Sequence, residues 1–116
     1  MEFVEKQPIY MQIADYFCEN ILEGKWKTHD RLPSVREIAV AMEVNPNTAM
    51  RAFTYLQDKG IIYNKRGIGY FVDEDGHSKA LKLKRDDFIE KDVPAFFKTM
   101  KLLKFSCKEL EELNKE

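Results

Sequence analysis

The sequence has few cysteines and no long hydrophobic run. Its two cysteines, Cys18 and Cys107, lie far apart without metal-ligand spacing, which argues against a disulfide framework and a zinc site. No apolar stretch approaches the roughly 18 residues that a membrane helix needs, and the N-terminus has charges where a signal peptide has its apolar core. We therefore expect a reduced, cytoplasmic protein that holds no metal or cofactor and does not bind a membrane.

The chain also lacks an overall excess of charge, but the balance is uneven along it. It has 19 Lys and Arg residues against 20 Asp and Glu residues. The net charge is −3 over residues 1–43, +3 over residues 44–72 and −1 over residues 73–116. The near-zero total therefore hides a basic middle segment, and it does not argue against a nucleic-acid ligand.

Catalytic signatures are missing as well. The sequence shows no paired nucleophile and base, no H-E-x-x-H zinc motif, no phosphate-cradling glycine loop and no carboxylate pair on one predicted face. Both histidines, His29 and His77, fall in predicted turns, where a solvated side chain is expected. The length of 116 residues is short for a two-domain metabolic enzyme. We therefore predict that the protein is not an enzyme.

Apolar spacing predicts three helices in the first 60 residues. The first has helical spacing from Ile9 to Leu22. A capping box formed by Ser34 and Glu37 starts the second helix. Asn47 is the expected cap of the third helix, which Gly60 ends.

A hairpin with a basic, glycine-containing tip follows the third helix. The β-rich runs 61–63 and 70–72 flank the segment Asn64-Lys65-Arg66-Gly67-Ile68-Gly69. The order of two helices, a tight turn, a third helix and a hairpin describes a winged helix-turn-helix. We assign residues 1–75 to this DNA-binding domain.

Residues 76–116 are predicted to form a short helical tail, so the fold class is α+β and mostly α. Residues 73–80 have the acidic, turn-like composition of a linker, and helical spacing resumes at Arg85. Pro94 must kink that helix or begin a new one. Ser106 and Glu109 repeat the capping box before a last short helix.

The tail has more apolar surface than a small domain can cover, so we expect it to form a homodimer interface. The alternative is that the apolar residues of the tail pack on the DNA-binding domain. Two DNA-binding domains that read the two half-sites of an operator also need a two-fold link between them, which a dimer provides. The predicted interface residues are Phe88, Ile89, Val93, Phe96, Phe97, Met100 and Leu103.

A family resemblance sharpens this interpretation. The stretch RLPSVREIAVAMEVNPNTAMRAFTYLQDKGIIYNKRGIGYFV, with PIYMQI and a G-K-W connection upstream, resembles the DNA-binding domain of the GntR family of bacterial transcription regulators. The VNPNT turn and the short tail most resemble its small YtrA-type subfamily. The resemblance implies a sequence-specific repressor that binds a palindromic double-stranded DNA operator as a homodimer. It also implies that the tail makes the dimer and can sense a small-molecule effector, whose existence and identity both stay open.

Candidate DNA contacts begin at the second helix. Ser34 lies at a helix start, whose free N–H groups can bind a phosphate, although it can equally serve as the cap. Arg36 lies in the first turn, where a cation opposes the helix dipole, so we expect an anion or a base as its partner. The resemblance implies that this arginine reads guanine; the alternative is a salt bridge with Glu37 or Asp30.

The other candidates lie on the third helix and the hairpin tip. Short side chains at the helix start let the backbone approach the major groove, and the basic tip can enter the minor groove or lie along phosphates. Arg51 can reach a phosphate or bridge to Asp58. These candidates are Asn45, Asn47, Thr48, Arg51, Lys65, Arg66 and Gly67. The competing hypothesis is a protein-interaction module with the same fold.

Overall fold

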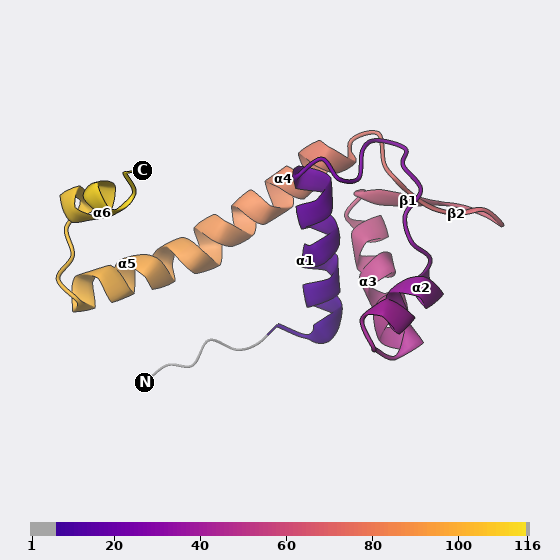
Figure 1. Ribbon diagram of the computed structural model, residues 1–116, viewed down its shortest axis with the longest axis horizontal. Helices are drawn as coiled ribbons and strands as arrows, with labels where there is room; N and C mark the ends of the chain where they lie inside the picture. Colours follow the sequence, from indigo (N-terminus) through magenta and orange to yellow (C-terminus); the bar gives the residue numbers. More distant parts are fainter. Residues whose placement is uncertain (1–6, 116) are drawn as a thin grey trace. The chain divides into compact units, whose positions relative to one another are not determined.

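The computed structural model of the protein describes residues 7–115 (Figure 1). Its contacts divide the chain between Lys82 and Leu83 into two compact units, which we call the head (residues 7–82) and the tail (residues 83–115). The chain is mostly helical with one small antiparallel sheet, which is the predicted fold class. None of the helices within residues 7–115 combines the length and the apolar character needed to span a bilayer.

The head is built on three helices, α1 (Ile9–Leu22), α2 (Val35–Ala41) and α3 (Pro46–Asp58). Helix α1 has the bounds that its apolar spacing predicts. Helices α1 and α2 both pack on α3. At the centre the fully buried rings of Phe17 and Phe53 meet edge to face, with centroids 5.1 Å apart. Trp26 covers Phe17 from the loop after α1, at 4.9 Å.

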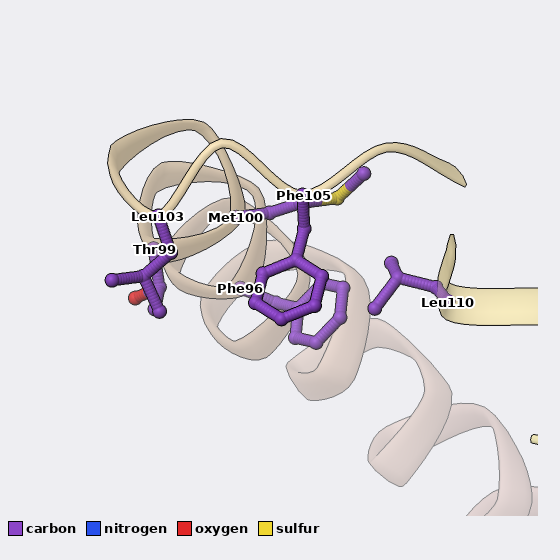
Figure 2. Close-up of a pocket in the computed structure, with 6 residues that line it drawn as sticks. All are labelled: Phe96, Thr99, Met100, Leu103, Phe105 and Leu110. Atoms are coloured by element: carbon purple, nitrogen blue, oxygen red, sulfur yellow. The ribbon is translucent and has the colours of Figure 1, made fainter. Parts of the chain in front are cut away.

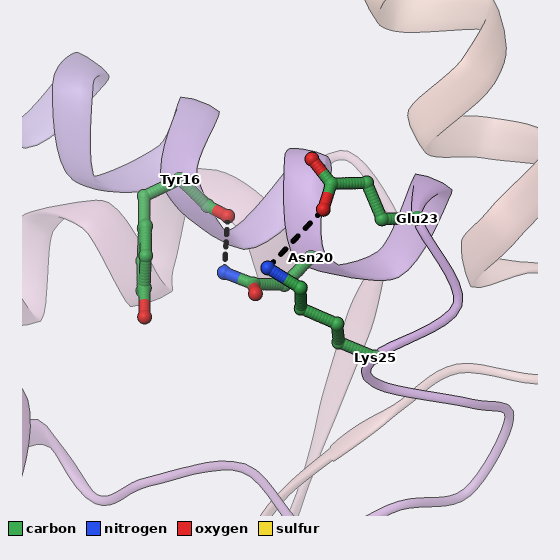
Figure 3. Close-up of polar contacts among 4 residues, drawn as sticks. All are labelled: Tyr16, Asn20, Glu23 and Lys25. Atoms are coloured by element: carbon green, nitrogen blue, oxygen red, sulfur yellow. Dashed lines mark hydrogen bonds and ion pairs between the residues drawn. The ribbon is translucent and has the colours of Figure 1, made fainter.

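The end of α1 is fixed by Asn20, a buried polar residue (Figure 3). Its side-chain amide donates a hydrogen bond to the Tyr16 carbonyl at 2.8 Å. The backbone carbonyl of Asn20 accepts hydrogen bonds from the backbone N–H groups of Lys25 and Trp26, so the chain turns back immediately after the helix. Gly24 takes a positive φ of 79° in this turn, a conformation that costs glycine little.

Helix α2 begins as predicted, whereas the predicted cap of α3 is wrong. Ser34 and Glu37 form the reciprocal capping box. The N-cap of α3 is Asn45, whose side chain accepts from the N–H of Asn47 at 2.8 Å. Pro46 decides this, because a proline suits the first helical position and its missing N–H is not needed there. Asn47 therefore lies inside the first turn of the helix.

The hairpin pairs β1 (Ile62–Lys65) with β2 (Gly69–Val72), which leaves only residues 66–68 at the tip. A third segment extends this sheet. The N–H groups of His29 and Leu32 donate to the carbonyls of Val72 and Tyr70, at 2.9 and 2.8 Å. The connection between α1 and α2 therefore ties the hairpin to the helices. Figure 1 shows the hairpin projecting beyond the helices of the head.

The segment predicted as a linker, residues 73–80, is mostly helical. Only residues 73–75 form a turn, and α4 (Gly76–Asp87) begins immediately after them. Gly76 and Ala80 are buried, and a Cβ on Gly76 would lie 2.6 Å from the Ile61 carbonyl oxygen. This close packing outweighs the low helix propensity of the sequence Gly-His-Ser. The head therefore continues through the first turns of α4.

The tail begins within α4 and passes Pro94 without a break in its helical conformation. A π-helical segment, η1 (Phe88–Asp92), leads directly into α5 (Val93–Leu102). The N–H of Val93 donates to the Phe88 carbonyl, five residues back. Pro94 then lies in the first turn of α5, where it needs no N–H. Pro94 therefore begins α5, which is one of the two predicted outcomes, but the chain stays helical from α4 through η1 into α5.

Helix α6 (Cys107–Leu113) completes the tail and begins with the predicted capping box of Ser106 and Glu109. Lys104, with a φ of 60°, reverses the chain between α5 and α6. A hollow of about 150 Å³ lies between them, and Figure 2 shows Leu110 pointing toward the rings of Phe96 and Phe105. No residue in the range 83–115 is fully buried.

Candidate nucleic-acid interface

Helices α2 and α3 form the helix-turn-helix of the head. The turn between them is tight, because the Val44 N–H donates to the Ala39 carbonyl at 3.0 Å and Glu43 adopts a φ of 54°. The inward face of α3 is apolar, and its buried residues are Ala49, Ala52, Phe53 and Leu56. The opposite face is exposed and contains Asn47, Met50, Arg51 and Thr54. Helix α3 therefore has an outward face available to a ligand.

The predicted contacts at the start of α3 lie at the open end of this helix. Asn45 and Asn47 are exposed, and Thr48 is half-buried. The Asn45 side chain is used as the helix cap, while the Asn47 side chain carries no capping role. The structure thus brings all three together, and of these Asn47 is the most available for a contact to a base.

Arg51 has a partner that the sequence did not indicate. Its guanidinium lies over the ring of Tyr10 on α1, 4.1 Å from the ring centroid. Tyr10 also meets Tyr55 of α3 edge to face at 6.3 Å. A cation held over an aromatic face keeps its N–H donors, so Arg51 is steadied on the α1 side of the outward face and remains exposed.

The two candidates on α2 differ in how far their groups are engaged. The Ser34 hydroxyl accepts from the Glu37 N–H at 3.1 Å, and the Glu37 carboxylate accepts from the Ser34 N–H at 3.2 Å. The capping box therefore engages the carboxylate of Glu37, one of the two alternative partners of Arg36, and the carboxylate of the other, Asp30, accepts from the Lys27 N–H at 2.8 Å. Arg36 is exposed in the first turn of α2, where the helix dipole disfavours a cation and an external anion would stabilise it.

The hairpin tip presents cations around a glycine. Lys65 and Arg66 are exposed, and the Lys65 ammonium lies 5.1 Å from the Phe71 ring centroid. Gly67 has a φ of 79°, and a Cβ added there would meet no atom within 4 Å. The absence of a side chain leaves the backbone of the tip open to a close approach.

The structure adds residues that the sequence analysis did not single out. Arg31 is exposed and pairs with Phe71 at the edge of the sheet, with its guanidinium group close to Gly69. The sequence around Arg31 does not indicate this position, because the pairing of the connection before α2 with β2 depends on a contact between distant parts of the chain. Tyr70 of β2 donates a hydrogen bond to Met50 of α3, a contact between residues 20 positions apart.

Comparison with known proteins decides the family. Residues 9–72 match the model of the bacterial regulatory proteins of the gntR family. The chain belongs to the GntR family. The matched range covers all of α1, α2, α3, β1 and β2. The head is therefore the DNA-binding helix-turn-helix of a transcription regulator.

Two curated relatives are similar to this chain, and the match to the first of them extends into the tail. The HTH-type transcriptional regulator YhcF of Bacillus subtilis is 33% identical over 111 residues, which cover 96% of this chain and 90% of YhcF. The transcriptional repressor YtrA of the same organism is 45% identical over 67 residues, which cover 58% of this chain and about half (52%) of YtrA.

A solved structure supports the same assignment. A GntR-family transcriptional regulator from Bacteroides thetaiotaomicron is 43% identical, with a TM-score of 0.72 over 91% of this chain and 92% of that chain. The predicted resemblance to GntR regulators, including YtrA, is therefore confirmed.

Proposed function

We propose that the protein binds a palindromic operator as a homodimer and represses transcription from it. In this proposal α3 enters the major groove, and the hairpin serves as a wing on the minor groove or the phosphates. The observation that carries it is the hydrogen bond from Tyr70 to Met50, at 3.9 Å between Oη and Sδ. It joins β2 to the outward face of α3, so the exposed helix face and the wing belong to one surface.

The charges on this surface suit DNA. Arg36, Lys65 and Arg66 are exposed cations that can neutralise phosphates or, for the arginine fork, bind guanine. Asn47 adds a short polar side chain on α3 that fits the edge of a base. Cations for the backbone and short polar groups for the bases are the two components of sequence-specific binding.

The tail supports a homodimer. Phe88, Ile89, Phe96, Phe97 and Leu103 are about half exposed or more, while Val93 and Met100 are half-buried. A second copy of the chain would cover this apolar surface and set two heads at a fixed spacing on a two-fold site. An effector would then bind where the two tails meet, near the hollow of about 430 Å³ beside Phe88 and Phe97. The name of YtrA as a repressor supports repression rather than activation.

The test is selection of duplexes from fragmented genomic DNA, followed by affinity measurements at several salt concentrations. We expect a palindromic sequence to be enriched and its affinity to fall steeply with salt, because several phosphates are neutralised per protomer. Arg36→Ala and Arg66→Ala should each weaken binding, and a phosphate contact should lower the salt slope by about one per site.

The control is Lys25→Ala, which also removes one exposed cation. Lys25 lies in the loop after α1, which is part of neither α3 nor the hairpin tip, and it pairs with Glu23 at 3.2 Å (Figure 3). It should leave the affinity unchanged. The absence of any enriched sequence would contradict the proposed function. Enrichment that tolerates both arginine substitutions would instead place the DNA on another surface of the protein.

A further inference from the structure

The outward face of α3 contains one large apolar side chain among polar ones. Met50 is 44% exposed, one turn after Asn47 and one turn before Thr54. An exposed methionine on a helix that is otherwise polar on this face has no packing role in the core of the head. Its position on the face that meets DNA in the proposed function makes it a candidate contact.

The Met50 side chain is held from the wing. The ring of Tyr70 packs on the fully buried Phe53, with centroids 4.7 Å apart, and this fixes the direction of its hydroxyl. That hydroxyl donates to the Met50 sulfur at 3.9 Å. A thioether is a weak acceptor, so the bond orients the side chain more than it stabilises the fold.

Arg51, the next residue along α3, contacts a different element of the head. Arg51 lies over Tyr10 of α1, whereas Met50 contacts Tyr70 of β2. The cation and the apolar side chain are therefore separated on the same turn of α3. Met50 is therefore the residue of the outward face that lies next to the wing, one turn after Asn47.

We propose that Met50 reads the 5-methyl group of a thymine in each half-site and that Tyr70 is its positioning residue. The thymine methyl is the apolar feature that a base pair presents in the major groove, and it is recognised by apolar contact. A methionine is polarisable and adaptable, but it has three rotatable bonds to order. The hydrogen bond from Tyr70 restricts that freedom before DNA binds, which lowers the entropic cost of the contact.

This inference rests on the proposed function, and the experiment separates the two. The probe is the duplex that the wild-type chain enriches, with each thymine of one half-site replaced in turn by deoxyuridine, which removes only the methyl group. We expect one position at which the replacement weakens wild-type binding about fourfold, the amount that burial of one methyl-sized group provides. Fluorescence anisotropy at fixed salt measures the affinities.

Substitutions assign the effect to the two residues. Met50→Ala should bind the thymine and deoxyuridine duplexes equally. Met50→Leu should keep the preference for thymine, because it keeps an apolar side chain. Tyr70→Phe keeps the ring on Phe53 and removes the hydroxyl. Made alone, it should reduce the preference for thymine over deoxyuridine. Added to Met50→Leu, it should have no effect on that preference.

Thr54→Ala is the matched control on the same face of α3, and it should leave the preference for thymine intact. Unfolding followed by Trp26 fluorescence checks that each variant has a folded head. If no duplex is enriched, the proposed function fails and this inference fails with it. If a duplex is enriched but deoxyuridine is tolerated at every position, or the preference survives Met50→Ala, only the inference is overturned.

Discussion

The head and the tail use the same local devices but differ in what they bury. In the head Phe17, Phe53 and Leu56 are completely inaccessible to solvent. In the tail no residue from 83 to 115 is fully buried, and Phe96 and Phe97 are about half exposed. Short helices are marginal in water without tertiary packing. We infer that the head folds on its own core and that the tail depends on a surface supplied by a second copy.

The largest expected effect is on the stability of the head. Phe53→Ala should lower its free energy of unfolding by about 3–5 kcal/mol, because it removes a fully buried ring and leaves a cavity beside Phe17. Trp26 is the one tryptophan of the sequence and packs on Phe17, so its fluorescence during urea unfolding reports the head.

The matched control for this prediction is Phe97→Ala in the tail. Because Phe97 is about half exposed, this substitution should move the Trp26 transition by less than about 0.5 kcal/mol. Equal destabilisation by the two substitutions would contradict the proposed independence of the head's core.

The next effect is on assembly. The double substitution Phe96→Glu with Phe97→Glu should give monomers, because it places four charges in the proposed two-fold interface. Operator affinity should then fall by about 10²-fold, since the two heads no longer bind as a linked pair. Sedimentation at micromolar concentration and anisotropy with the enriched duplex measure the two results.

Lys101→Glu on the same helix is the control for the change in net charge alone, because it also lowers the net charge by two per protomer and Lys101 is exposed. It should remain dimeric. A wild-type chain that sediments as a monomer would remove the basis of the dimer, and unchanged affinity in the Phe96 and Phe97 variant would show that the heads bind independently.

The sequence predicts elements well where one strong local pattern decides. Helix α1 runs from Ile9 to Leu22 as its spacing indicates, and both capping boxes form. The cap of α3 was harder, because Asn45 and Asn47 are both good caps and only the preference of Pro46 for the first helical position distinguishes them. Where two local signals compete, the sequence predicts the start of a helix only to within one or two residues.

The parts that the sequence could not provide depend on distant contacts. The stacking of Arg51 on Tyr10 and the hydrogen bond between Tyr70 and Met50 join residues 41 and 20 positions apart. The start of α4 at Gly76 depends on packing against Ile61. The nine DNA-contact candidates and the seven interface residues remain predictions, since their test requires DNA and a second chain.

Gly76 offers a test of where the head ends. Gly76→Ala should destabilise the head by about 1–3 kcal/mol, because the new methyl group would lie 2.6 Å from the Ile61 carbonyl oxygen and 2.9 Å from Val72. Urea unfolding followed by Trp26 fluorescence measures it. His77→Ala, at an exposed neighbouring position of α4, should have little effect. An unchanged transition in Gly76→Ala would place the start of α4 outside the head.

The smallest effect tests the comparison most directly, because the same motif occurs in both units. Ser34 and Ser106 each cap a seven-residue helix, and each accepts from the glutamate N–H three residues on at 3.1 Å. Ser34→Ala should lower the stability of the head by about 1 kcal/mol, as loss of an N-cap does in a cooperatively folded unit. Ser106→Ala removes an equivalent bond, but α6 belongs to the unit without a buried core. It should leave the Trp26 transition unchanged and speed amide hydrogen exchange only in α6. If Ser106→Ala shifted the Trp26 transition as much as Ser34→Ala, the two units would unfold as one, and the tail would share the core of the head.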